Sequence, residues 1–135
     1  KDSSGDLFAL GLLCSGGRTP LIFEGNETLM LPALLYGACG GIGSGHNVAP
    51  RLFARMWRQY QAGDIAGAAR TQLRINELLD AVISVTGPIL NGVKDILEWM
   101  GLPCGALRSP NRPLTQEERT ELKRRLERVG FFEEL

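Results

Sequence analysis

Two short strand-like segments, each ending near glycine and each beside a helical segment, constrain the fold of this chain most. Residues 19–24 (T-P-L-I-F-E) end at Gly25, and the middle of residues 38–45 is a second, glycine-dense strand. Helices are expected at residues 7–13 and 27–36, so strands and helices alternate. This alternation pairs the strands in parallel through right-handed crossovers. The chain is therefore expected to adopt an α/β fold.

The rest of the chain, from Ala49 onward, is predicted to be helical. Thr115 and Glu118 form a capping box that opens the last helix. One apolar stripe comprises Leu52, Phe53, Met56, Trp57 and Tyr60, and the next comprises Ile65, Ala68, Ala69, Ile75, Leu79, Val82 and Ile83. Two strands, or three if one ends at Lys1, cannot close a barrel or make a covered sheet. We therefore expect the 135 residues to be part of a larger folding unit.

The charge balance and the cysteines argue against several classes of protein. The chain has 15 Lys plus Arg and 15 Asp plus Glu, which indicates neither nucleic acid nor an anionic membrane as a partner. Its longest apolar runs are well short of the ~20 residues that a membrane span requires. The three cysteines include no C-x-x-C pair, so no metal site or disulfide framework is indicated. Cys14 and Cys39 are interpreted as small buried residues, and the pattern predicts a cytoplasmic protein.

Four motifs, in order along the chain, carry a resemblance to a known family. K-D-S-S-G-D at residues 1–6 resembles the motif that holds the Schiff-base lysine in the dihydrodipicolinate synthase/N-acetylneuraminate lyase family, at the end of the sixth barrel strand. F-E-G-N-E-T at residues 23–28 and G-A-C-G-G-I-G-S-G-H-N-V-A-P at residues 37–50 resemble the family's seventh and eighth strand ends. G-V-K-D-I-L-E-W-M-G-L at residues 92–102 is similar to its C-terminal helical extension.

The resemblance implies a fold and an organisation. Residues 1–63 would be the C-terminal part of a (β/α)8 TIM barrel, from the end of strand 6 to helix 8, and residues 64–135 a C-terminal helical extension. A complete barrel of this kind needs about 250 residues. The missing N-terminal half of the barrel is therefore an expected partner, and that half would carry the family's acid/base tyrosine and its paired-hydroxyl motif.

Lys1 is the residue to which the resemblance assigns the chemistry. A neutral lysine amine attacks the ketone of a 2-oxo acid, and the resulting iminium ion draws electrons from the C3–C4 bond. Burial against barrel walls favours the neutral amine, because desolvation disfavours the ammonium. On position alone, Lys1 would be an ordinary exposed terminal lysine, whereas the flanking motifs favour catalysis. No metal or organic cofactor is implied, because the lysine itself supplies the electron sink.

Three expected substrate contacts follow the glycine-dense strand. The resemblance implies that the Ile42 carbonyl faces the bound pyruvoyl group and that nearby glycines permit close approach. Gly43 stands where many synthases have serine, and Ser44 matches a serine that contacts the sugar chain in sialic-acid lyases. Ile42 is expected to be a buried strand residue in either case, and the alternative for Ser44 is a polar turn residue.

Three more expected contacts follow the first strand. Gly25, Glu27 and Thr28 match positions where related aldolases hydrogen-bond substrate hydroxyls. A carboxylate at Glu27 would suit a polyol tail, because it accepts hydrogen bonds from two hydroxyls. The alternative for Glu27 is a favourable acid at a helix N-terminus that needs no ligand. His46, the only histidine, is interpreted as structural.

The expected function is a Schiff-base lyase or aldolase that cleaves or forms a carbon–carbon bond to pyruvate in a 2-oxo acid. Glu27 and Ser44 favour a 2-keto-3-deoxy sugar acid or a sialic-acid-type substrate. Residues 87–94 favour it too, because they depart from the Asn-Pro-x-Pro pattern that the synthases usually carry there. The alternatives are a 4-hydroxy-tetrahydrodipicolinate synthase (pyruvate plus aspartate semialdehyde), a keto-deoxy sugar acid dehydratase and a non-catalytic family member. The resemblance also implies a homo-oligomer, either a dimer or a tetramer.

Overall fold

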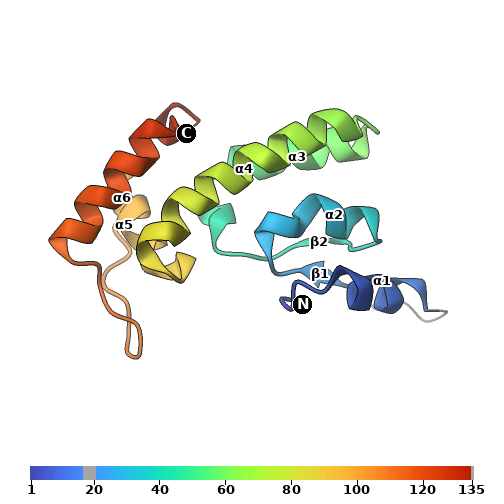
Figure 1. Cartoon of the computed structure of the whole chain (residues 1–135), viewed down its shortest axis with the longest axis horizontal. Coiled ribbons are helices and arrows are strands. Elements are labelled where there is room, and N and C mark those ends of the chain that lie inside the picture. The colour runs from blue at the N-terminus through green and yellow to red at the C-terminus, as the bar shows by residue number, and fades with distance from the viewer. Residues whose placement is uncertain (17–20, 135) are drawn as a thin grey trace. The chain divides into compact units, whose positions relative to one another are not determined.

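The computed structural model describes residues 1–16 and 21–134, which form two compact units. The first unit consists of Lys1–Gly43 and Ala54–Leu73, and the second of Ser44–Phe53 and Arg74–Leu135. Helices α3 (Pro50–Gln61) and α4 (Ile65–Thr86) contribute residues to both units. Figure 1 labels the elements that are described below for each unit in turn.

Three extended segments of the first unit pair in parallel. Strand β1 (Phe23–Glu24) pairs with β2 (Gly40–Gly41), and Asp2 forms an isolated parallel bridge with Glu24. This confirms the parallel pairing expected from the alternation of strands and helices. The first strand was expected from residue 19, but residues 19–20 lie outside the described part, and the observed strand covers only its last two residues.

Short helices pack beside these strands (Figure 1). Helix α1 (Leu7–Ser15) is capped by Asp6, whose Oδ1 accepts a hydrogen bond from Ala9 N at 3.0 Å. A 3-10 turn, η1 (Glu27–Leu29), leads directly into α2 (Met30–Leu35). The small core between the helices and the strands comprises Leu10, Ile22, Ala33 and Ala38, with Leu7 and Cys14 at its margin.

Helices α3 and α4 show where the predicted apolar stripes hold and where they fail. Most of the predicted positions are buried, as expected: Leu52, Phe53, Met56, Ala68, Ile75, Leu79 and Val82. Ile65 and Ile83, however, are 39% and 41% exposed. Ile65 is the first residue of α4, and Ile83 lies one step of about 100° around the helix from buried Val82. Both therefore fall outside the buried face.

The second unit is helical. It contains the 3-10 turn η2 (Gly45–Asn47), helices α5 (Ile89–Trp99) and α6 (Gln116–Arg128), and the 3-10 turn η3 (Phe131–Glu133). Its buried side chains include Val82, Val93, Ile96, Leu122, Leu126 and Phe131. The predicted capping box is confirmed, because Thr115 Oγ1 accepts from Glu118 N at 3.2 Å and Glu118 Oε2 accepts from Thr115 N at 2.8 Å.

The two cysteines that were expected to be buried differ in exposure. Cys14 is half-buried, but Cys39 is exposed, so its prediction as a buried residue is wrong. Neighbouring residues in extended backbone face opposite sides, and Ala38 takes the buried position next to it. Among the described residues, no helix combines the length and the apolar character that crossing a membrane requires.

Candidate active site

The carboxyl ends of the three parallel segments meet at one edge of the first unit. Asp2 N donates to Phe23 O at 2.9 Å, and Gly25 N donates to Asp2 O at 2.5 Å. Ile42 N donates to Glu24 O at 2.8 Å, which extends the ladder to the second strand. This edge therefore gathers the three sequence motifs at which the chemistry was expected, as the C-terminal rim of a barrel does.

The two faces of this small sheet have different partners. A side chain at Gly41 would overlap Met30 Sδ, so one face packs on α2. A Cβ atom at Gly25 would lie 2.5 Å from Lys1 Cε, so the lysine stem lies on the opposite face. Because successive strand residues alternate, Ile42 shares this face with Lys1. It is 51% exposed, so its expected burial as a strand residue is wrong. The structure thus brings Lys1, Gly25 and Ile42 to one open face.

Lys1 itself is exposed, although we expected a water-poor pocket around its amine. The described residues supply one wall of such a pocket, namely the strand edge with Gly25. Three strand ends form only part of a rim, whereas eight strands enclose the interior of a complete barrel. The Schiff-base role of Lys1 stays a prediction.

Glu27 and Gly43 lie against each other. Glu27 is only 7% exposed, and its Cγ, Cδ and Oε1 atoms occupy the space that a side chain at Gly43 would take. The backbone at Gly43 does not have a positive φ, so space and not conformation requires glycine there. The serine expected at this position in many synthases would therefore displace the Glu27 carboxylate.

The loop between β1 and η1 is held by its own side chains. Glu24 is 2% exposed, and its Oε1 accepts from Asn26 N at 2.6 Å. Asn26 Oδ1 then accepts from Thr28 N at 3.2 Å and from Thr28 Oγ1 at 2.7 Å. The Thr28 hydroxyl proton is committed to Asn26, so Thr28 would act toward a substrate hydroxyl as an acceptor. Glu24 was not among the residues expected at the site, and its signal in the sequence is an acid at the end of a buried strand.

Gln72 is a second residue that was not expected at the site. It lies on α4 at only 5% exposure and contacts the segment that carries Glu27 and Thr28. Its signal is its place on the buried face of the helix, four residues after Ala68 and three before Ile75. A polar residue on the buried face of a helix indicates that its side chain makes hydrogen bonds in the interior.

Ser44 directly follows Gly43 in the chain and begins the second unit. It is half-buried, and its carbonyl accepts from Asn47 N at 3.2 Å and from Asn47 Nδ2 at 3.0 Å. The nearby His46 ring stacks on Phe53, with 3.9 Å between the ring centroids, which agrees with a structural role. Substrate contact by Ser44 stays a prediction.

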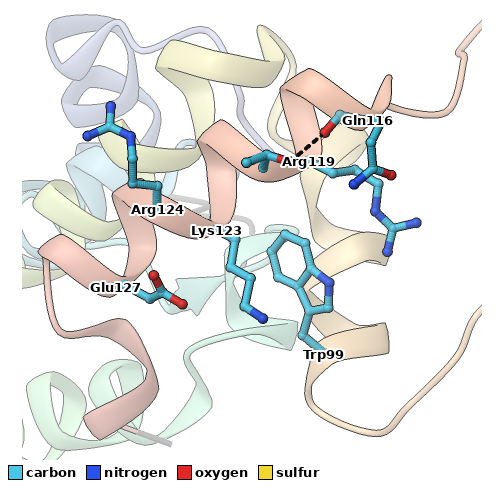
Figure 2. Close-up of a pocket in the computed structure, with 7 residues that line it drawn as sticks. Trp99, Gln116, Arg119, Lys123, Arg124 and Glu127 are labelled. Atoms are coloured by element: carbon cyan, nitrogen blue, oxygen red, sulfur yellow. Dashed lines mark hydrogen bonds between the residues drawn. The ribbon is translucent and has the colours of Figure 1, made fainter.

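The second unit also carries an open groove of about 600 Å³ (Figure 2). It is lined by Trp99, Gln116, Arg119, Thr120, Lys123, Arg124 and Glu127. Acids neutralise two of its cations: Arg119 lies 3.0 Å from Asp95 and 3.4 Å from Glu98, and Arg124 lies 2.7 Å from Glu121. The partly buried Arg119–Asp95 pair links α6 to α5, whereas the more exposed Arg124–Glu121 pair belongs to an ordinary helix surface. No group of three His, Cys, Asp or Glu residues within the described ranges could hold a metal ion.

Comparisons with known proteins agree with this geometry. A profile of the Dihydrodipicolinate synthetase family matches residues 1–129. The 4-hydroxy-tetrahydrodipicolinate synthase of Thermus thermophilus is 37% identical over 133 residues, which cover 98% of this chain and 44% of that protein. The N-acetylneuraminate lyase of Citrobacter koseri is 31% identical over 124 residues, which cover 91% of this chain and 41% of that protein.

The similarity extends to solved structures. A dihydrodipicolinate synthase from Bacillus anthracis matches with a TM-score of 0.82 at 27% identity, over 94% of this chain and 43% of that one. The chain spans less than half the length of the relatives it matches. Its described elements are the C-terminal part of a (β/α)8 TIM barrel followed by helices. The chain belongs to the dihydrodipicolinate synthetase family.

Proposed function

We propose that this chain is the lysine-bearing part of a Schiff-base lyase that releases or condenses pyruvate. The barrel half that its relatives carry outside the matched region would complete the pocket; we call the two together the complete barrel. The observation that supports this proposal best is the placement of the Lys1 stem across Gly25, on the open face of parallel strand ends. Proteins of this family that resemble the chain include a synthase and a lyase.

The reaction that we propose balances without a cofactor. Lys1 Nζ bonds to C2 of the 2-oxo acid, and water leaves, giving an iminium ion. The C3–C4 bond breaks, its electron pair moves toward the iminium nitrogen, and the C4 hydroxyl loses a proton to give an aldehyde. The enamine then takes a proton at C3, and water releases pyruvate from Lys1. Condensation is the reverse sequence.

The aldehyde portion of the substrate would lie toward Glu27 and Thr28. The buried Glu27 carboxylate beside Gly43 supports a hydroxyl-rich tail, because a carboxylate accepts hydrogen bonds from hydroxyls. We therefore propose a 2-keto-3-deoxy sugar acid or sialic-acid-type substrate. The second candidate is the synthase reaction with aspartate semialdehyde, since the chain is 37% identical to a synthase and 31% identical to a lyase.

Borohydride trapping with pyruvate tests the proposed chemistry. Peptide mass spectrometry of the complete barrel should locate the reduced adduct on Lys1 and not on Lys94, which donates to the Cys104 and Ala106 carbonyls elsewhere. Lys1→Arg should abolish the adduct while preserving the charge, because a guanidinium does not form this imine. A wild-type protein without an adduct at Lys1 would reject the lyase and support a non-catalytic family member.

Substrate assays then separate the enzymatic candidates. Pyruvate release from sugar acids supports the lyase, condensation with aspartate semialdehyde supports the synthase, and water loss without pyruvate release supports a dehydratase. We also propose a cytoplasmic homo-oligomer, a dimer or a tetramer, on the basis of the resemblance. Sedimentation of the complete barrel tests that assembly.

A further inference from the structure

Gln72 uses both ends of its side-chain amide to hold a segment far away in the sequence. Its Oε1 accepts from Leu31 N at 2.8 Å. Its Nε2 donates to Glu27 O at 3.0 Å and to Thr28 O at 3.3 Å. Gln72 and residues 27–31 all belong to the first unit. One rigid, planar group thus spans the junction between η1 and α2.

The junction needs a partner of this kind. Leu31 lies in the first turn of α2, where backbone N–H groups have no partner within the helix. The N-cap residue of this helix, Leu29, makes no side-chain capping bond. Gln72 supplies the missing acceptor from outside the segment, and its 5% exposure means that water competes little for these bonds.

The position of the Glu27 side chain depends on this junction. The Glu27 carbonyl accepts from Gln72 Nε2 in addition to Met30 N, and the Glu27 side chain crosses Gly43. A rotation of the peptide between Glu27 and Thr28 would move both side chains. The contacts of Lys1 with Gly25, in contrast, involve no atom of Gln72.

We propose that Gln72 is a positioning residue that sets substrate specificity by fixing Glu27 and Thr28 through their backbone. This inference rests on the proposed function, because it assigns those two side chains to the aldehyde portion of the substrate. Gln72 acts on that portion and not on the pyruvoyl group held by Lys1. Loss of Gln72 should therefore affect binding of the aldehyde portion of the substrate but not adduct formation between pyruvate and Lys1.

Gln72→Glu is the informative variant, and Thr71→Val is its matched control. The glutamate keeps an oxygen that can accept from Leu31 N. Its second carboxylate oxygen, however, replaces the Nε2 donor and faces the Glu27 and Thr28 carbonyls. Thr71 is the adjacent residue, is similarly buried at 4% exposure, and donates to Gln59 Oε1 at 2.7 Å. Thr71→Val thus removes one partly buried hydrogen bond from the same helix, and that bond involves no residue of the 27–31 segment.

In the complete barrel, Gln72→Glu should raise KM for the cleaved substrate by about tenfold or more, as expected when a binding group is misplaced. Borohydride trapping of pyruvate at Lys1 should stay within about twofold of wild type, and Thr71→Val should change neither quantity. An equal rise in KM for Thr71→Val, or an unchanged KM for Gln72→Glu, would overturn the inference. A parallel loss of trapping in Gln72→Glu would also overturn it, because the effect would then be general.

Amide hydrogen exchange distinguishes a failure of the positioning role of Gln72 from a failure of the proposed function. In Gln72→Met, the Leu31 amide loses its acceptor and should exchange faster, whereas Thr71→Val should leave it protected. Unchanged protection in Gln72→Met would refute the positioning role itself. A wild-type protein that forms no adduct at Lys1 but shows the exchange difference would refute the proposed function, and the specificity role with it.

Discussion

Gly43→Ala should couple energetically to Glu27. The added Cβ would come closer than 3.0 Å to three Glu27 side-chain atoms, so the glutamate must move. Extra methyl groups in a packed site cost about 1–3 kcal/mol. The obstructing atoms, Cγ, Cδ and Oε1, belong to a flexible side chain, so its rotation can relieve the overlap and we expect a loss of about 1 kcal/mol in unfolding free energy. The backbone adds nothing, since φ at Gly43 is not positive.

A double-mutant cycle measures this coupling. In a Glu27→Ala background, the obstructing atoms are gone, and the additional cost of Gly43→Ala should fall close to zero. The coupling free energy should therefore be about 1 kcal/mol, above the roughly 0.3–0.5 kcal/mol by which independent sites depart from additivity. Urea denaturation of the wild type, the two single variants and the double variant gives the four values.

Gly16→Ala is the control for the cycle. Apart from its chain neighbours, no described residue has an atom within 4 Å of the position that its Cβ would take, and its φ of −69° suits alanine. It should show no coupling to Glu27→Ala. Equal costs of Gly43→Ala in the two backgrounds would refute the assigned contact, and with it the explanation of why serine is absent at this position.

Three further predictions concern the strand edge and the last helix. Gly25→Ala should slow borohydride-trapped adduct formation at Lys1 by about tenfold or more, because its Cβ would overlap Ser3 Oγ and lie 2.5 Å from Lys1 Cε, so the segment that carries the lysine must move; an unchanged rate would contradict the placement. Thr115→Ala should lower the unfolding free energy by about 1 kcal/mol through loss of the N-cap, measured by thermal denaturation, and no change would argue against the capping box. Hydrogen bonds from Arg112 lower the pKa of Glu118 from 4.5 to about 2, so their contribution to stability is present above pH 4.5 and is lost as the pH falls to about 2. Arg112→Gln should move the acid loss of α6 helicity to higher pH in circular dichroism, and an identical acid transition would contradict the pairing.

The sequence predicts those parts of the structure that local rules determine. Alternating strands and helices indicated parallel pairing, and the ladder from Asp2 through β1 to β2 confirms it. The spacing of Thr115 and Glu118 indicated a capping box, which is present. The motif around Lys1 indicated its place at a strand end, beside the first strand.

Local sequence rules could not predict the contacts between residues that are distant in the sequence. Glutamate at 27 and glycine at 43 were each noted, but no periodicity reveals that one fills the space left by the other. Gln72 lies 41 residues from Leu31, and its role depends on how α4 packs against η1 and α2. The exposure of Lys1 differed from expectation because enclosure of a barrel interior requires strands that the chain does not contain among its described residues.

The hydrogen bonds from Gln72 to residues 27–31 limit where chimeras between members of this family can be joined. Residues 27–31 belong to the barrel portion that we expected at residues 1–63, whereas the glutamine that holds them belongs to the expected extension. A chimera joined at that boundary would inherit the loop from one parent and its anchor from the other. If the donor lacked glutamine at the matching helix position, the graft would lose the acceptor of the Leu31 amide and the Nε2 donor of the Glu27 and Thr28 carbonyls. Crossover points after residue 72 would keep loop and anchor in one module.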